Sequence, residues 1–408
     1  MAHKENTSNK KRVGAFVAWI GCSAMAALLL LAQGVYDPSA LLFFFALILG
    51  VLVFRKMSFR VSYLIIASML ARTYYAYYLY SNGIVLFPDT YGYFQTVRAM
   101  LQADSLSFLT VVTYSGTLHV GYYYVAYLAL RIFKTDLALY LLNIFLFFLS
   151  TLILSDYLEQ EFGKGMAKAI TVFINLSPFM FLFTSDVLKD SLVLFLAVSS
   201  LWAYRRYQCT HWRRYIVSML MFLSLLTLTR IYSGVGLAVG IMVDFLANRD
   251  TKVETRKVLL LFGAMTIVFL FSPLRPLVDL GIFFITQIAL SVATVTTLLK
   301  ATISFLFSPL FWNMTYEVTK YTPLVLDSAL LLVFSPLLLN FFVGFIRNKE
   351  VRKRTYIYVL PMLFHILALG ITFETGGDRQ KIAVYPFIVL FYLLGLRAAF
   401  RQSKAGHE

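Results

Sequence analysis

The stretch Phe87-Pro88-Asp89-Thr90-Tyr91-Gly92-Tyr93-Phe94 stands in the first long polar interval between apolar segments of a 408-residue chain. Apolar runs precede it, and apolar runs make up most of the sequence that follows. An acidic residue among aromatic residues just beyond a membrane helix is typical of the boundary between water and lipid. The stretch therefore predicts a helical membrane protein with a polar site at one surface, suited to a molecule with a polar head and a lipid tail.

Two roles for Asp89 are open on the sequence alone. A Pro-Asp pair also begins many short surface helices, with the acidic side chain as N-cap. The other role is chemical, because a carboxylate at the membrane surface can accept a proton. Spacing does not separate the two roles, and one residue can fill both.

Composition supports the membrane class. Hydrophobic residues make up 60% of the chain and charged residues 14%, with a mean hydropathy of +0.76. A soluble protein carries about a quarter charged residues. Repeated apolar runs of about 20 residues predict an all-α polytopic membrane protein, organised by the bilayer as one bundle.

The net charge of +16 does not predict a nucleic-acid partner, because the basic residues gather in short blocks between apolar runs. Such blocks mark the cytoplasmic ends of membrane helices. The blocks are Lys10–Arg12, Arg55–Lys56, Arg205–Arg206, Arg213–Arg214 and Arg347–Arg354. The two cysteines, one in an apolar run and one in a basic loop, predict neither a disulfide nor a thiolate metal site.

The apolar runs predict roughly 11 to 14 membrane-spanning segments and no soluble domain. Residues 1–60 form a cytoplasmic tail and a membrane hairpin in this scheme. Residues 61–256 form a first membrane module, with an external loop at 81–117, and residues 257–408 form a second module. Within the external loop, Tyr91–Gln102 is polar enough for a helix that lies on the interface.

Four consecutive runs conflict with this topology. They cover about residues 118–133, 136–155, 166–183 and 187–204. Four full crossings from the outside would leave the basic block after residue 204 outside, whereas the charge rule places it inside. Either one run does not cross fully, or two runs form a single broken element.

The predicted topology brings several ionisable side chains to the external face. Arg230 and Arg379 lie in short polar turns with glycines nearby, and Lys189 and Asp190 join them if their loop is external. Ionisable residues at membrane helix ends are costly unless they are paired or functional, although long basic side chains also snorkel to headgroups. One acid with several cations suits a lipid phosphate, because guanidinium groups bind phosphate bidentately.

The sequence predicts no cofactor. His119 is the one histidine predicted on the external face, so a histidine-based metal site is not expected. The chain has no P-loop, G-x-G-x-x-G, C-x-x-C or G-x-S-x-G motif. A divalent cation stays compatible with the acidic residues.

Four short motifs follow one another along the chain. An acid beside aromatic residues occurs at Phe87–Tyr91, and a histidine followed by aromatic residues occurs at Leu118–Tyr123. Ser177-Pro178 precedes the acidic turn Ser185–Ser191, and Asp378-Arg379 precedes Tyr385-Pro386. In this order the motifs resemble those of the GT-C membrane glycosyltransferases, which use polyprenyl-phosphate sugars and include the dolichyl-phosphate-mannose mannosyltransferase-like group.

The resemblance covers most of the first 240 residues loosely and the last 40 more faintly, and it rests on short motifs. It implies a GT-C-like bundle with interfacial helices in the first large external loop. Two departures stand out. Two helices precede the loop that the family places after its first helix, and the paired acidic dipeptide of some members is reduced to Asp89 alone, which weakens any implied metal site.

The resemblance implies transfer of a sugar from a polyprenyl-phosphate donor to a hydroxyl of a glycan, lipid or protein acceptor, with inversion. Asp89 would be the general base, and Arg230 and Arg379, with Lys189, would hold the lipid phosphate. The other substrate-binding residues would be Tyr91, Tyr93, His119, Asp190 and Tyr232. The enzyme would lie in a bacterial cytoplasmic membrane, with its site on the periplasmic face.

Two other functions are weighed against this one. A polysaccharide polymerase of the O-antigen or capsule type would use the external arginines with a lipid-pyrophosphate oligosaccharide, and would give Asp89 no assigned role. A transporter for a lipid-linked sugar would be expected to show inverted repeats with broken helices at mid-membrane. No internal repeat is evident in the sequence, which favours the enzymes.

Overall fold

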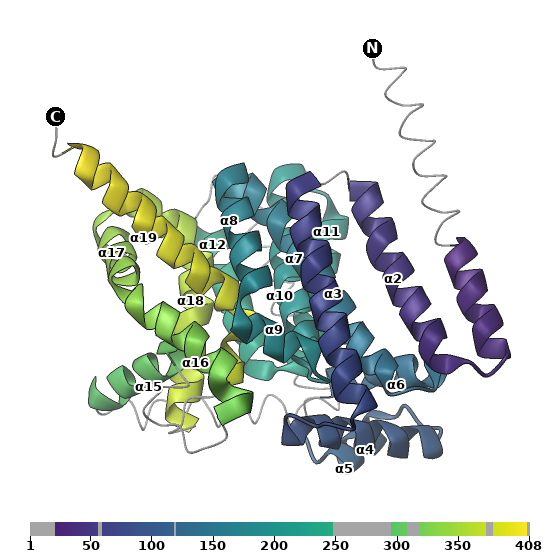
Figure 1. Ribbon diagram of the computed structural model, residues 1–408. Coiled ribbons are helices and arrows are strands. Elements are labelled where there is room, and N and C mark those ends of the chain that lie inside the picture. The colour runs from purple at the N-terminus through teal and green to yellow at the C-terminus, as the bar shows by residue number, and fades with distance from the viewer. Residues whose placement is uncertain are drawn as a thin grey trace. The chain divides into compact units, whose positions relative to one another are not determined.

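The computed structural model of the protein describes residues 21–55, 59–117, 120–247, 295–307, 318–372 and 378–405. All secondary structure in these ranges is helical (Figure 1), which confirms the predicted all-α class. The elements are α2 (Tyr36–Arg55), α3 (Phe59–Ser81), α4 (Pro88–Gln102), α5 (Phe108–Ser115), α6 (Gly121–Phe133), α7 (Leu137–Phe162), α8 (Lys164–Leu176), α9 (Pro178–Ser185), α10 (Asp190–Thr210), α11 (Arg213–Thr229), α12 (Ile231–Ala247), α15 (Val295–Phe307), α16 (Val318–Val333), α17 (Ser335–Arg347), α18 (Lys349–Thr372), the 3-10 helix η2 (Asp378–Ala383) and α19 (Tyr385–Ala405).

Within the described residues, α7 alone is an unbroken helix that is long and apolar enough to cross a membrane. Two bent pairs would bring the number of spans to three if each pair is one span. One pair is α8 with α9, bent by 61°, and the other is α16 from Leu324 with α17, bent by 54°. The predicted 11 to 14 spans therefore remain a prediction, and part of the apolar sequence, residues 248–294, lies outside the described residues.

Two features bear on the conflict among the four runs after residue 118. Helix α6 has 13 residues, so it is about 20 Å long, shorter than the roughly 30 Å hydrocarbon core of a bilayer. The run predicted at 166–183 is broken at Ser177, because Pro178 has no N–H to continue the hydrogen bonding of α8. Which of the four runs fails to cross therefore stays open, with α6 and the bent pair α8–α9 as the two candidates.

The chain divides into two compact units, and each is described by itself. Unit 1 comprises Met1–Leu152 and Met180–Phe195, and unit 2 comprises Ile153–Phe179 and Leu196–Glu408. The chain passes between the units within α7, α9 and α10. The modules predicted at 1–60, 61–256 and 257–408 stay a prediction.

In unit 1, the beginning of α2 packs against the end of α6 and the beginning of α7. The buried cluster between them contains Phe44, Phe133 and Leu141, and the rings of Phe44 and Phe133 lie 5.7 Å apart. Helices α4 and α5 lie across the end of α3 (Figure 1), and α4 also packs on α6. The helix predicted at Tyr91–Gln102 is present as α4, which begins three residues earlier, and its position on the membrane interface stays a prediction.

Unit 2 is built around two close helix pairs, α12 with α18 and α17 with α19. The first pair needs small residues, because a Cβ at Gly240 would lie 2.9 Å from the Pro361 ring of α18. In the second pair, the rings of Phe341 and Phe391 stack with centroids 4.4 Å apart. These contacts fix the helices that carry the candidate residues of unit 2.

Candidate functional site

Asp89 lies in the first turn of α4 and its side chain is exposed. The N-cap of this helix is Phe87, whose backbone is extended, and Pro88 occupies the first helical position. The interpretation of Asp89 as N-cap is therefore wrong. The helix begins at Pro88, whereas an N-cap at Asp89 would make it begin two residues later, at Thr90. A carboxylate in the first turn is still favoured by the partial positive charge of the helix N-terminus.

A buried hydrogen bond holds the start of α4 in place. The hydroxyl of Thr90 donates to Oδ2 of Asp186 over 3.1 Å, and Oδ1 of Asp186 accepts from the backbone N–H of Val187 over 2.6 Å. Both Thr90 and Asp186 are fully buried. Next to this bond, the rings of Phe87 and Phe183 stack with centroids 5.2 Å apart. The residue next to Asp89 is thus anchored to the turn between α9 and α10.

Tyrosine side chains lie beside Asp89. Tyr93, one helical turn after it, packs its ring against those of Tyr122 and Tyr123, with centroids 4.8 and 5.2 Å apart. Burial raises the pKa of Tyr123 to about 12, and the negative charge of Asp89 contributes to the rise. Tyr91 is 57% exposed, and it makes no hydrogen bond or ring contact with any described residue. The structure therefore brings Asp89 and Tyr93 together but leaves Tyr91 apart.

The turn that carries Lys189 and Asp190 is held by Asn143 of α7. The Nδ2 of Asn143 donates to the backbone oxygens of Asp186, over 2.6 Å, and of Leu188, over 2.8 Å. Its Oδ1 accepts from the Tyr122 hydroxyl over 3.2 Å. Asp190 begins α10 and is fully buried, whereas Lys189 is half-buried. Asp89, Tyr93 and the turn at 186–190 are therefore parts of one connected network in unit 1.

Arg72 in α3 is a fully buried cation close to this network. Its Nε donates to the hydroxyl of Thr184 over 3.0 Å, and a terminal nitrogen donates to the hydroxyl of Ser68. The guanidinium also lies over the rings of Phe147, 4.3 Å from the centroid, and Phe181, 5.1 Å away. Arg72 thus joins α3 to α9 through Thr184, two residues before Asp186.

The candidate residues of unit 2 gather at the junction of α11 and α12. Arg230 is the extended residue between the two helices and is fully buried, with its guanidinium 5.8 Å from the Tyr232 ring. The Tyr232 ring meets the His365 ring edge-on at 5.4 Å, and Nε2 of His365 lies 2.9 Å from the Ser233 hydroxyl. Arg230 and Tyr232 are thus brought together with a histidine of α18.

Arg379 lies in η2, which packs against α15, α18 and α19. Its side chain is half-buried. Two residues later, Lys381 is fully buried, with its ammonium 4.9 Å from the centre of the Phe179 ring. The same unit contains the buried carboxylate of Asp327, whose Oδ1 accepts hydrogen bonds from Ser177 and Tyr385 over 2.9 and 2.6 Å.

The predicted site residues therefore fall into two groups. Asp89, Tyr91, Tyr93, Lys189 and Asp190 belong to unit 1, and Arg230, Tyr232 and Arg379 belong to unit 2. His119 lies outside the described residues. Among the residues that the structure describes, no group of three or more potential metal ligands occurs.

Sequence reasoning did not select Asp186, Arg72 or His365 as site residues. Asp186 stands in the quoted turn Ser185–Ser191 but was not distinguished there from its neighbours. The sequence does indicate a buried, partnered side chain at Arg72, because an ionisable residue inside an apolar run is costly unless it has a partner. His365 lies in an apolar run, and nothing in the sequence pairs it with Ser233.

Comparisons with known proteins identify no relative. No family model matches the chain, and neither a curated protein nor a solved structure matches it.

Proposed function

We propose that the protein is an integral membrane glycosyltransferase that moves a sugar from a polyprenyl-phosphate donor to an acceptor hydroxyl, with inversion at the anomeric carbon. The enzyme would lie in a bacterial cytoplasmic membrane with its site on the external face. The proposal rests on the chemistry of the residues in the two candidate groups and on the motif order of the sequence.

Helix lengths support the membrane part of the proposal. Helices α2, α3, α7, α10, α18 and α19 each have 20 residues or more, which corresponds to about 30 Å or more. This is the thickness of the hydrocarbon core of a bilayer. Helices α4 and α5 have 15 and 8 residues, too few to cross the hydrocarbon core, and they lie in the predicted external loop. We therefore propose that they lie at the membrane surface.

The observation that carries the catalytic proposal is the setting of Asp89. The residue is exposed, while its neighbour Thr90 is hydrogen-bonded to buried Asp186. The buried rings of Tyr93 and Tyr123 pack against each other next to Asp89. An accessible carboxylate on a rigid support is what a general base requires, because proton transfer depends on precise distance to the acceptor hydroxyl.

In the proposed reaction, Asp89 takes the proton of the acceptor hydroxyl as its oxygen attacks the anomeric carbon. The new carbon–oxygen bond forms on the side opposite the lipid phosphate. The bond from the anomeric carbon to the phosphate oxygen breaks, and its electron pair leaves with the lipid phosphate. A cation would hold that phosphate and stabilise its growing charge. Lys189 belongs to the same unit as Asp89, and the phosphate-binding roles of Arg230 and Arg379 stay as the motif resemblance implies them. No proton is needed on the leaving group.

A second function is compatible with the same residues. Arg230 is fully buried beside Tyr232 and His365, a setting that suits a pyrophosphate-binding arginine as well as a monophosphate-binding one. A polysaccharide polymerase that uses lipid-pyrophosphate oligosaccharides would depend on Arg230 and not on Asp89. The donor and the response to Asp89 substitution distinguish the two enzymes.

The test is sugar transfer in proteoliposomes with a panel of polyprenyl-phosphate sugars and lipid-pyrophosphate oligosaccharides. Wild type is compared with Asp89→Asn and with Glu159→Gln, a control at an exposed acid of α7. Transfer from a monophosphate donor that is lost only in Asp89→Asn supports the proposal. Transfer from a pyrophosphate donor that persists in Asp89→Asn supports the polymerase, and no transfer from any donor overturns both.

A further inference from the structure

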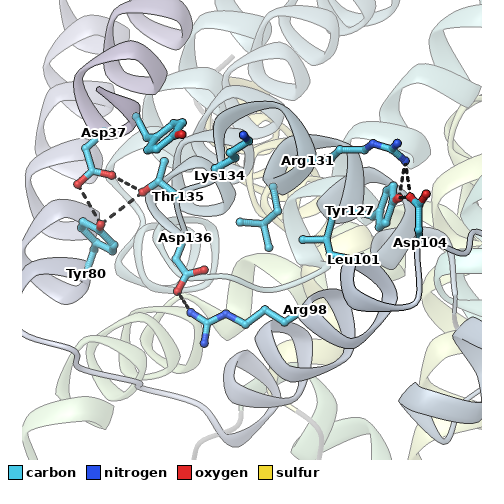
Figure 2. A pocket seen from close by; sticks show the side chains of 12 residues that line it. Asp37, Tyr80, Arg98, Leu101, Asp104, Tyr127, Arg131, Lys134, Thr135 and Asp136 are labelled. Atoms are coloured by element: carbon cyan, nitrogen blue, oxygen red, sulfur yellow. Dashed lines mark hydrogen bonds and ion pairs between the residues drawn. The ribbon is translucent and has the colours of Figure 1, made fainter. Parts of the chain in front are cut away.

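A cavity of about 710 Å³ in unit 1 lies where α2 begins and where α3, α4 and α6 end (Figure 2). Its volume is in the range of small-molecule sites, roughly 300–1,000 Å³. Leu101 lies between the charged groups in Figure 2, and Leu130 also lines the cavity. The remaining lining residues are Tyr36, Asp37, Tyr80, Arg98, Asp104, Tyr127, Arg131, Lys134, Thr135 and Asp136.

Cations and carboxylates are equal in number around this cavity, and most of them are paired with each other. Arg98 forms an ion pair with Asp136, and Arg131 pairs with Asp104 over 3.1 Å (Figure 2). Arg131 also donates to the hydroxyl of Tyr127 over 2.6 Å. In each of these two ion pairs the opposite charges neutralise each other without a ligand. Neither pair therefore favours an anionic or a cationic ligand through its net charge.

One cation and one carboxylate of the cavity are not joined to an opposite charge. Lys134 is exposed, and its ammonium lies 5.7 Å from the centre of the Tyr36 ring. Asp37 accepts hydrogen bonds from the Tyr80 hydroxyl, over 2.9 Å, and from Thr135. Neither Lys134 nor Asp37 forms an ion pair with any residue that the structure describes.

The backbone holds Lys134 in an uncommon conformation. It follows the last residue of α6 with a φ of +53°, in the left-handed region. Asp104, on the opposite rim of the cavity, has a φ of +41°. Residues other than glycine adopt such angles rarely, and Lys134 does so as the C-cap that ends α6. The left-handed turn directs the chain so that Lys134, Thr135 and Asp136 all line the cavity.

We propose that this cavity binds a zwitterionic phosphoethanolamine group, with its phosphate at Lys134 and its ammonium at Asp37. One unpaired cation and one unpaired carboxylate match one anionic and one cationic group on a single ligand. A primary ammonium donates hydrogen bonds to a carboxylate, which a quaternary choline group has no N–H to do. The lipid form of this ligand rests on the membrane placement in the proposed function, and not on the sugar-transfer chemistry.

The surroundings of the cavity favour a lipid over a free headgroup as the source of the zwitterion. On α6, the helix that contributes Leu130 and Arg131, the side chains of Leu128 and Ile132 are 53% and 55% exposed. Exposed apolar side chains beside a polar pocket suit a ligand with acyl chains. The occupant we infer is therefore a phosphatidylethanolamine headgroup at the membrane surface.

The experiment uses the full-length protein purified in detergent. Short-chain phosphatidylethanolamine, phosphatidylcholine and phosphatidylglycerol are added in mixed micelles, and free phosphoethanolamine is added in a separate series. Bound lipid is counted by native mass spectrometry, and thermal unfolding is followed in parallel. The variants are Lys134→Gln and Asp37→Asn, with Lys349→Gln as a control at an exposed lysine that makes no described contact.

Wild type should bind phosphatidylethanolamine about tenfold more tightly than the other two lipids, since it alone offers both charged hydrogen-bonding groups. Each cavity variant should lose about tenfold in affinity, whereas Lys349→Gln should bind as wild type does. Lys134→Gln leaves the Asp37 hydrogen bonds intact, so its loss would not reflect misfolding. Equal binding of all three lipids, or unchanged binding in both variants, overturns the proposal.

If free phosphoethanolamine binds as tightly as the lipid, the cavity is a zwitterion site, but the inference that its ligand is a lipid is overturned. None of these readouts depends on sugar transfer. The cavity proposal and the glycosyltransferase proposal can therefore fail independently.

Discussion

The hydroxyl of Thr90 donates a hydrogen bond to Oδ2 of Asp186 across 3.1 Å, and the two residues are 96 positions apart in the chain. The bond is buried, so water does not replace it if it is broken. Because Thr90 follows Asp89 directly, the position of the Asp89 carboxylate depends on this link. Asp186 therefore acts on the candidate base through another residue, as a positioning residue.

Thr90→Val should destabilise the protein by about 1–3 kcal/mol, because it leaves an acceptor of buried Asp186 without its donor. The maximal transfer rate should fall about tenfold while the KM for the donor changes little, since only the base is displaced. Thr90→Ser keeps the hydroxyl and should restore both properties. Thermal unfolding in detergent and initial rates in proteoliposomes measure the two effects. A KM change without a rate change would contradict the positioning role.

Asp89→Asn should lower the transfer rate by roughly 10²–10⁴-fold, the usual contribution of a general base. Donor binding and thermal unfolding should stay as in wild type, because the side chain is exposed and nearly the same size. Asp89→Glu retains a carboxylate in a displaced position and should keep part of the activity. Full activity in Asp89→Asn would mean that Asp89 is not the general base and has only a structural role in the first turn of α4.

The helical class and the presence of a helix in the first loop could be predicted from the sequence, because both follow from local composition. The run at 136–155 corresponds to α7, and the polar segment at Tyr91–Gln102 corresponds to α4. The start of α4 was predicted less well. Pro88 begins the helix and Phe87 takes the N-cap position, whereas capping preferences alone favoured Asp89.

The partners of the site could not be predicted, because they join distant parts of the chain. Asn143 was one polar residue in an apolar run, yet it holds the backbone of Asp186 and Leu188. Likewise, the partners of Arg72 come from α3, α7 and α9. Periodicity predicts which face of a helix is buried, but it carries no information on which buried polar groups meet.

Arg72→Lys should destabilise the protein by roughly 2–3 kcal/mol, although the charge is kept. A lysine has no planar guanidinium to lie over Phe147 and to donate to Thr184 and Ser68 at once. Thermal unfolding in detergent measures the effect, with Tyr74→Phe as a control at an exposed residue of the same helix. Equal melting temperatures for Arg72→Lys and wild type would show that charge alone is needed at this position.

Arg230→Lys should weaken donor binding about tenfold or more, because a lysine replaces bidentate hydrogen bonding to phosphate with a single point charge. The acceptor KM should not change. Arg214→Lys is the control, since Arg214 is exposed and stacks on Trp212. Donor affinity is measured by competition with a non-hydrolysable polyprenyl phosphonate. If donor affinity were unchanged while unfolding shifted, Arg230 would be a structural cation of the α11–α12 junction.

Gly395→Ala should disrupt unit 2 far more than Gly344→Ala, although both glycines lie in the α17–α19 pair. A Cβ at Gly395 would overlap the backbone carbonyl of Leu337, whereas a Cβ at Gly344 would meet no atom within 4 Å. Backbone cannot move aside as a side chain can, so Gly395→Ala should cost about 3 kcal/mol or more. Gly344→Ala should instead raise stability by about 0.5–1 kcal/mol, because alanine restricts the unfolded chain. Thermal unfolding of the two variants side by side provides the test. Similar melting temperatures would mean that α17 and α19 do not pack as closely as this contact requires.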